Sequence, residues 1–290
     1  MNKLLDSNLF NQEFVPKRHK FYDGRAKSDI SLASSAQKRF GMEKKMKRFM
    51  LTVAYDGTAY SGFQVQKSCR TIEGELNRCL SSLLGEDIHV IGASRTDAGV
   101  HAICNKAVFD SETAIPAGKL AYALNQRLPE DIRIQKSEQV PEDFHPRRCE
   151  SRKTYEYRIT TGEFPIPTRR LYSAHCYYSL DMGRMQEAAA YLEGKHDFKS
   201  FCAAAAVVDS TVRTIYFVSV ERQEEEIVIR VCGNGFLYNM VRIIAGTLME
   251  AGRGKWPPEK MREILEERDR KAAGPTAPAC GLTLMKYEFL

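Results

Sequence analysis

The stretch Gly92–Ala102, GASRTDAGVHA, decides the first half of the fold, because apolar residues predict a strand on either side of it. Within it Arg95 and Asp97 stand two positions apart, and Gly99 marks a sharp turn or a close approach of another group. A guanidinium beside a carboxylate favours the ionised form of that carboxylate. Asp97 is therefore a candidate base or nucleophile with Arg95 as its partner, although an isolated motif of this kind also fits a tight turn with a local ion pair.

Outward from this stretch, apolar periodicity predicts strands and helices in turn. Thr71 and Gly85 bracket an amphipathic helix as N-cap and C-terminal stop. Strands are predicted near 49–55, 87–93, 100–109, 132–137, 152–161, 175–179, 214–221, 226–232 and 282–289. Helices are predicted near 117–127, 182–192, 236–250 and 258–268. The fold class is therefore α+β, with two similar halves rich in β-α-β units.

Three segments follow from these patterns. Residues 1–45 have no sustained period, several serines and mixed charge, which predicts a weakly ordered extension or a segment upstream of a true start at Met42 or Met46. Residues 46–150 form a first α+β subdomain that carries the Asp97 motif. Residues 151–290 form a second subdomain, which completes the site.

Composition limits the possible functions. The net charge of +6 comes from residues 1–49, which hold 12 Lys/Arg and 5 Asp/Glu, so RNA binding by the rest must depend on local clusters. The eight cysteines form no C-x-x-C pair, the six histidines have no metal-ligand spacing, and no nucleotide-binding loop is present. We therefore expect no metal and no cofactor. Without a long apolar run or a signal sequence, we expect a cytoplasmic protein without a membrane span.

Six blocks of sequence resemble, in order, motifs of the tRNA pseudouridine synthase A family. They are Val53–Thr58 with Gly62–Gln64, Ser94–Ala102, Lys153–Tyr157, Gly194–Phe198 with Val212–Ile215, Gly233–Arg242, and Gly274–Pro278 with Gly281–Leu282. The resemblance runs from about Arg48 to Leu290. It implies two ferredoxin-like β-α-β subdomains that share a central antiparallel sheet, with a catalytic cleft between them.

The resemblance also implies an activity: isomerisation of uridine to pseudouridine at positions 38–40 in the anticodon stem-loop of tRNA, by a homodimer without a cofactor. Asp97 would be the catalytic carboxylate, Arg95 would help to extract the base, Tyr155 would stack on it and take part in proton transfer, and Arg242 would pair with Asp97. Each has a plainer interpretation. Arg95 fits a strand-edge residue, Tyr155 a cross-strand aromatic, and Arg242 a helix-border residue with its head in water.

Basic residues that cluster locally are the predicted RNA-binding rim: Arg147, Arg148, Arg152 and Lys153, then Arg169 and Arg170, then Arg253 and Lys255. Each also fits an ordinary solvated surface. Asn234 and Asn239 are interpreted as turn and cap residues, and His101 and His145 as structural histidines.

Three alternative functions remain: a pseudouridine synthase of the same fold with another RNA target, a catalytically silent RNA-binding protein, and a carboxylate glycosidase. The glycosidase would need a second acid, for which Asp56 is the nearby candidate.

Overall fold

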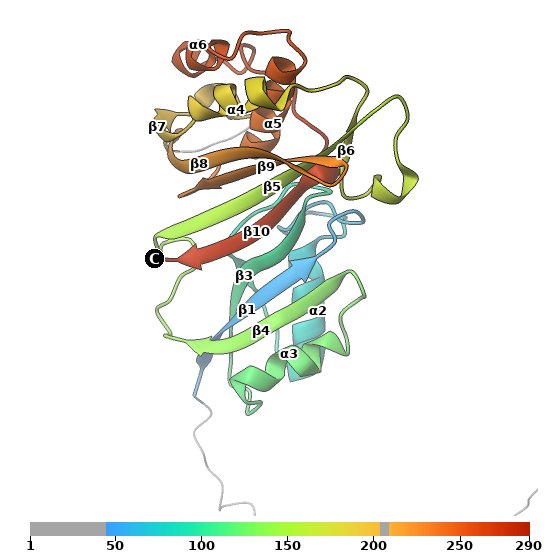
Figure 1. Cartoon of the computed structure of the whole chain (residues 1–290). Coiled ribbons are helices and arrows are strands. Elements are labelled where there is room, and N and C mark those ends of the chain that lie inside the picture. Colours follow the sequence, from blue (N-terminus) through green and yellow to red (C-terminus); the bar gives the residue numbers. More distant parts are fainter. Residues whose placement is uncertain (1–44, 204–208) are drawn as a thin grey trace, which may run out of the picture. The chain divides into compact units, whose positions relative to one another are not determined.

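The computed structural model describes residues 45–203 and 209–290, so the predicted extension falls outside the described residues except for Lys45. One ten-stranded sheet runs through this part of the chain (Figure 1), in the order β4-β1-β3-β10-β5-β9-β8-β7 with β2 beside β3 and β6 beside β5. The strands are β1 Lys47–Tyr55, β2 Ile91–Gly92, β3 His101–Ser111, β4 Ile132–Val140, β5 Ser151–Thr161, β6 Ala174–Cys176, β7 Gly194–Asp197, β8 Val212–Gln223, β9 Glu226–Gly233 and β10 Leu282–Phe289.

The C-terminal strand β10 joins the two halves of the sheet, because it lies between β3 and β5. Its pairing with β5 is antiparallel and its pairing with β3 is parallel, while β5 and β6 form a second parallel pair. Leu284 faces Ala102 on one side and Tyr155 on the other. Through β10, the start of β3, where the Asp97 loop ends, is therefore in register with the middle of β5.

Helices cover each half of the sheet separately (Figure 1), with α2 Ile72–Leu84 and α3 Ala117–Asn125 on the first half and α4 Met182–Ala190, α5 Met240–Gly252 and α6 Lys260–Glu267 on the second. Short 3-10 turns occur at η1 Pro167–Arg169, η2 Lys199–Phe201 and η3 Ala279–Gly281. The predicted caps of the first helix are confirmed: the Thr71 side chain accepts a hydrogen bond from the Gly74 amide, and Gly85 is left-handed with φ 69°. The α+β fold class is therefore correct, and residues on both sides of the predicted boundary at 150/151 contribute to one sheet.

Most predicted elements differ from the structure by a few residues at their ends, and three differ more. The strand predicted near 87–93 is reduced to β2, because the amides of Ile88 and Val90 donate to the side chains of Ser81 and Asn77 rather than to a neighbouring strand. The helix predicted from 236 begins at Met240, after a left-handed residue. The strand predicted near 175–179 is only three residues long, and β7 was not predicted because its sequence, GKHD, has no apolar alternation.

The apolar side chains of both halves form one continuous buried core under the helices.

All eight cysteines are free thiols. Among the helices of the described residues, none has the length and apolarity needed to cross a membrane.

Candidate active site

The loop that carries Asp97 connects β2 to β3 and is held from beneath by a buried hydrogen-bond network. Asn105 on β3 is completely buried, and its side-chain amide donates to the Ser94 carbonyl at 2.9 Å and to the Tyr55 hydroxyl at 3.1 Å. The Tyr55 hydroxyl in turn lies 2.8 Å from the Thr96 hydroxyl. These contacts fix the backbone on the N-terminal side of Asp97, so the carboxylate is presented from a rigid support rather than from a free loop.

Two glycines allow this loop to pack closely against its neighbours. Gly99 has φ +77°, as expected for the sharp turn that follows Asp97. Gly62 has φ +90°, and a Cβ at this position would lie 2.7 Å from the Thr96 carbonyl oxygen. That carbonyl accepts a hydrogen bond from the Phe63 amide at 3.1 Å. The loop after β1 therefore packs directly on the backbone next to Asp97.

The substitution Gly62→Ala should lower both stability and activity, because the new methyl group would strain the backbone and push against Thr96. We expect a loss of about 1–3 kcal/mol in unfolding free energy, seen as a fall of several degrees in thermal denaturation. The control is Gly118→Ala in α3, where nothing lies within 4 Å of an added Cβ. Equal melting temperatures for the two variants would contradict the strain at Gly62.

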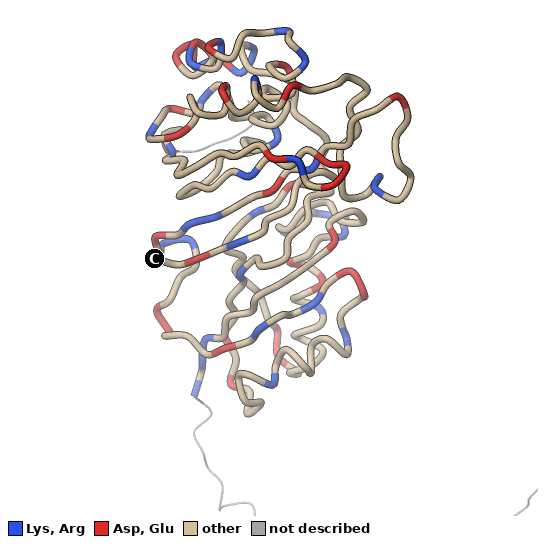
Figure 2. The backbone as a smooth tube through the Cα atoms, viewed as in Figure 1, with Lys and Arg blue, Asp and Glu red and all other residues tan. Residues whose placement is uncertain are grey.

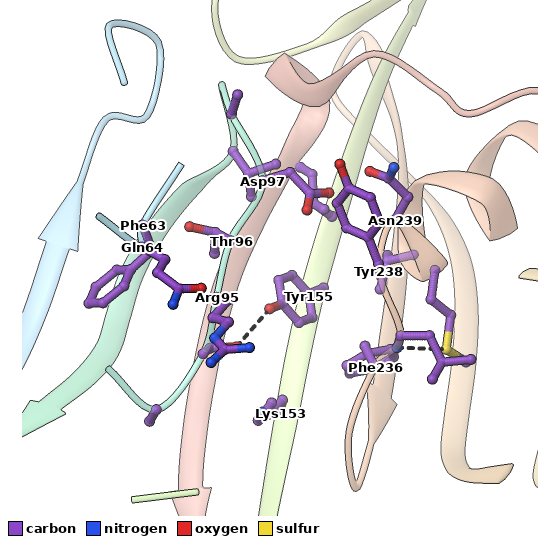
Figure 3. A pocket seen from close by; sticks show the side chains of 18 of the residues that line it. Phe63, Gln64, Arg95, Thr96, Asp97, Lys153, Tyr155, Phe236, Tyr238 and Asn239 are labelled. Atoms are coloured by element: carbon purple, nitrogen blue, oxygen red, sulfur yellow. Dashed lines mark hydrogen bonds between the residues drawn. The ribbon is translucent and has the colours of Figure 1, made fainter. Parts of the chain in front are cut away.

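Asp97 pairs with Arg242, which lies on the first turn of α5 (Figure 3 shows Asp97 beside Tyr238 and Asn239). Arg242 Nη1 lies 3.5 Å from Asp97 Oδ2, and each side chain is 17% exposed. The guanidinium is held by two further acceptors, since Nη1 donates to Asn239 Oδ1 at 2.8 Å and Nε donates to the Ala277 carbonyl at 2.8 Å. Burial raises the pKa of Asp97 above its ordinary value, and Arg242 opposes this rise.

This geometry confirms the pairing of Asp97 with Arg242 that the resemblance implied, and it corrects two other expectations. Among the ion pairs of residues 45–203 and 209–290, the partner of Asp97 is Arg242 and not Arg95. The residues around Asp97 are loop rather than strand, and although Arg95 and Asp97 both line the cavity described below, no ion pair joins them in the described part of the chain. The pKa of Asp97 is also raised, not lowered as two nearby arginines would predict, because burial outweighs the single arginine partner.

Tyr155 on β5 forms part of the wall opposite the loop. Its side chain is 6% exposed, its hydroxyl lies 3.1 Å from the Ser94 hydroxyl, and its ring meets the Phe236 ring edge-on with centroids 5.2 Å apart. Burial raises the pKa of Tyr155 to about 12, so the phenol keeps its proton at neutral pH. The same buried network thus links Tyr155, through Ser94, to the loop of Asp97.

A cavity of about 670 Å³ lies between these groups. Its size is within the range of about 300–1,000 Å³ that is usual for ligand sites. Both halves of the fold line it: Phe63, Arg95, Asp97, Arg147, Lys153, Tyr155, Phe236, Tyr238 and Asn239 are among the residues at its wall (Figure 3 shows most of them). Polar groups are therefore grouped around Asp97 and Tyr155, beside aromatic surfaces suited to a flat base.

The predicted RNA-binding residues do not all lie at this cavity. Arg147 and Lys153 line it, whereas Arg148 and Arg152 are exposed outside its lining. Arg152 lies over the Tyr216 ring, 4.8 Å from its centroid. In Figure 2 basic residues occur at the start of β5, near the C-terminus. These positions are compatible with RNA contact, and the contact itself stays a prediction.

The other basic residues of the predicted rim have partners within the protein. Arg169 pairs with Glu224 at 3.3 Å and reaches Glu226 at 3.8 Å, while Arg170 donates to the Pro167 carbonyl. Arg253 and Lys255 both pair with Glu250, at 3.3 Å and 2.6 Å. None of these four is among the residues that line the cavity.

Asp56 and His101 belong to a second cavity, of about 360 Å³. The His101 Nε2 lies 2.9 Å from the Leu171 carbonyl, and the Asp56 carboxylate accepts a hydrogen bond from the Tyr172 hydroxyl at 2.6 Å. Asp56 does not line the cavity of Asp97, so it is not placed as the second acid of a glycosidase. His145 Nδ1 accepts from the Arg147 amide at 3.3 Å, which fits the structural interpretation.

Sequence reasoning missed several residues that shape the site. Asn105 was not predicted, because a buried amide inside a strand has no distinctive pattern in the sequence. Tyr55 was predicted as a strand residue within the block Val53–Thr58, but not as a support of the Asp97 loop. Asn239 occupies the N-cap position of α5, as predicted, but its side chain makes no capping bond and instead accepts a hydrogen bond from Arg242. Its left-handed backbone, φ 62°, is a signal that the sequence alone does not carry.

The cavity lies where the two halves of one shared sheet meet, and its wall of a carboxylate, guanidinium groups and aromatic rings fits an enzyme site for a flat, polar substrate. The family model described as "tRNA pseudouridine synthase" matches residues 51–147 and 188–289. The chain therefore belongs to the tRNA pseudouridine synthase family and is an isomerase that acts on tRNA.

Individual relatives support this assignment over most of the chain. A protein of Brevibacillus brevis named tRNA pseudouridine synthase A is 48% identical over 84% of this chain and 100% of its own length. Proteins of the same name from Thermoanaerobacter sp. and Acetivibrio thermocellus are 46% and 44% identical, with the same coverage. Among solved structures, a Cbf5–Nop10–Gar1 complex gives a TM-score of 0.35 at 10% identity, over 82% of this chain and 48% of that chain.

Proposed function

We propose that the enzyme isomerises uridines at positions 38–40 in the anticodon stem-loop of tRNA, with Asp97 as the catalytic carboxylate. The observation that carries the assignment of Asp97 is its place in the wall of a cavity that Tyr155 also lines, together with its pairing with Arg242. A half-buried carboxylate with one guanidinium partner can act as a nucleophile or as a stabilising charge in the interior of a cleft.

The reaction requires that the N1–C1′ bond of uridine breaks, that the base turns, and that a C5–C1′ bond forms. The proton on C5 leaves to solvent and N1 gains a proton, so atoms and electrons balance without an oxidant or reductant. Asp97 in its ionised form would attack either the sugar or the base. Arg242 would favour that form against the cost of burial, and Arg95, exposed at the cavity, would contact the RNA from which the base has been extracted.

Tyr155 is suited to two tasks, stacking on the base and supplying a proton. The substitution Tyr155→Phe keeps the ring and its contact with Phe236 but removes the hydroxyl that lies near Ser94. We expect tRNA affinity within about threefold of wild type and a rate lowered by about a hundredfold, the lower end of general acid–base catalysis. Single-turnover tritium release from tRNA labelled at uracil C5 measures the rate, and a full rate for Tyr155→Phe would limit Tyr155 to stacking.

The target is tested by mapping pseudouridine in total tRNA from cells that lack the gene. Loss of pseudouridine at positions 38–40, restored by the wild-type gene and not by Asp97→Asn, supports the proposal. Loss at other positions would point to a pseudouridine synthase with a different target. An unchanged map, together with tRNA binding in vitro, would favour an RNA-binding protein without catalysis.

We also propose that the enzyme is a cytoplasmic homodimer, which light scattering of the purified protein and fractionation of cells would test.

A further inference from the structure

Lys153 is a half-buried amine in the wall of the cavity, two residues before Tyr155 on the same strand. Its Nζ lies 5.0 Å from the centroid of the Tyr287 ring. In the described part of the chain no carboxylate lies within 4.0 Å of Lys153, whereas Lys255 and Arg253 both have Glu250 as a partner. A buried ammonium group normally has a counter-charge, so the absence of a carboxylate beside Lys153 calls for an explanation.

The groups that face Lys153 add to this uncompensated positive charge. Arg213 on β8 and Arg147 in the loop before β5 both act on it as like charges, and Tyr287 on β10 presents its ring. Burial and these two arginines lower the pKa of Lys153 to about 8. Burial also lowers the pKa of Arg147, with a further contribution from Arg95, and it lowers the pKa of Arg213. The free protein thus keeps several cations close together at an energetic cost that a bound anion would remove.

Backbone carbonyl groups fix the positions of Arg147 and Arg213. Arg147 Nε donates to the Gly92 carbonyl at 2.9 Å, and Arg213 Nη1 donates to the carbonyls of Ser210 and Val212 at 2.9 Å and 2.6 Å. Each guanidinium therefore keeps other N–H groups for a ligand. Two positioned guanidinium groups near one ammonium group, with Arg147 and Lys153 in the cavity wall, match the oxygens of a phosphate.

We propose that Lys153, Arg147 and Arg213 form a binding subsite for a backbone phosphodiester of the RNA substrate, beside Tyr155, so that the phosphate is fixed where the neighbouring base stacks. The subsite rests on the proposed function only in that RNA is the substrate. A stacking ring next to a cationic groove is the arrangement that proteins use for single-stranded nucleic acid.

The subsite predicts a specific pH dependence of binding. The phosphate favours the charged form of Lys153 and raises its pKa in the complex, so the protein takes up a proton when RNA binds near pH 8. Affinity is then full below about pH 8 and falls as the pH rises above it, by at most about tenfold per pH unit. Arginine at position 153 stays charged over this range, so Lys153→Arg should remove the alkaline fall while it keeps most of the affinity.

The test measures the dissociation constant of unmodified tRNA between pH 6.5 and 9.5, with Asp97→Asn as the background so that no substrate turns over. We expect Lys153→Met to weaken binding at pH 7 by about tenfold, to flatten the pH dependence, and to reduce the slope of log affinity against log salt by about 0.7–0.9. The control is Lys119→Met on α3, an exposed lysine that does not line the cavity and removes the same charge.

Two results would overturn the proposal: equal dissociation constants and salt slopes for Lys153→Met and Lys119→Met, or an alkaline fall in affinity that persists in Lys153→Arg. Thermal denaturation of each variant separates loss of binding from loss of fold. Because the readout is binding, a failure here is distinct from a failure of the proposed function, which the pseudouridine map decides.

Discussion

The variant Asp97→Asn should lose isomerase activity by more than about a thousandfold while it still folds and binds tRNA. The amide has the shape of the carboxylate but no charge, so it can neither attack the substrate nor stabilise a cationic sugar. A loss of this size corresponds to the removal of a central electrostatic group from an active site. Within residues 45–203 and 209–290 the Asp97 side chain has one hydrogen bond, to Arg242 at 3.5 Å, so its replacement removes little that supports the fold.

The measurement is tritium release from tRNA labelled at uracil C5, with tRNA binding and thermal denaturation recorded on the same preparations. A matched control is Asp110→Asn, which removes an equally charged side chain from β3, where it pairs with Arg48 outside the cavity. The control should keep full activity. Activity of Asp97→Asn within tenfold of wild type would contradict the assignment of Asp97.

Local features of the fold were predictable from sequence because neighbouring residues determine them. The caps at Thr71 and Gly85 were predicted correctly since both depend on contacts within a few residues. Strands and helices were predicted from apolar periodicity. These predictions failed where side chains took the place of backbone hydrogen-bond partners, as Ser81 and Asn77 do for the segment before β2. The insertion of β10 between β3 and β5 had no local signal, because it joins segments that are far apart in the chain.

The site was predictable in its residues and, through the resemblance, in the pairing of Asp97 with Arg242, but not in the buried network that supports the loop. Asp97, Tyr155 and Arg242 were named through family resemblance, and the structure brings all three to one region. The pairing of Asp97 with Arg95 was expected from their closeness in sequence, and it was wrong because the carboxylate pairs with Arg242 instead. The partner, Arg242, is 145 residues away, and it was predicted through the family resemblance rather than from spacing.

The raised pKa of Asp97 could not be predicted from sequence, since it depends on how deeply the fold buries the carboxylate. It has a direct consequence for activity. If the ionised carboxylate is the active form, the rate falls as the pH falls through the pKa of Asp97. This decrease, the acid limb of the pH–rate profile, should therefore occur at a higher pH than the usual pKa of an aspartate, because burial disfavours the charged form.

The substitution Arg242→Met should lower turnover by about a hundredfold and move this acid limb to higher pH. The guanidinium is the group that opposes the effect of burial, so its removal lets the pKa of Asp97 rise further. A smaller fraction of the enzyme then carries the ionised carboxylate at neutral pH, and the transition state also loses a nearby positive charge. Affinity for tRNA should change less than turnover, because Arg242 is held by Asn239 and Ala277 inside the protein.

The pH profile of single-turnover tritium release distinguishes this electrostatic role from a structural one. A variant that only loosened α5 would lose rate equally at every pH, whereas loss of the partner of Asp97 should cost most at low pH and least at high pH. Arg242→Lys, which keeps a positive charge, should bring the acid limb back toward that of wild type, and Arg262→Met, an exposed arginine on α6, should leave it in place. An unshifted limb in Arg242→Met would mean that the ionisation of Asp97 does not depend on Arg242, and the pair would then have to act through position rather than charge.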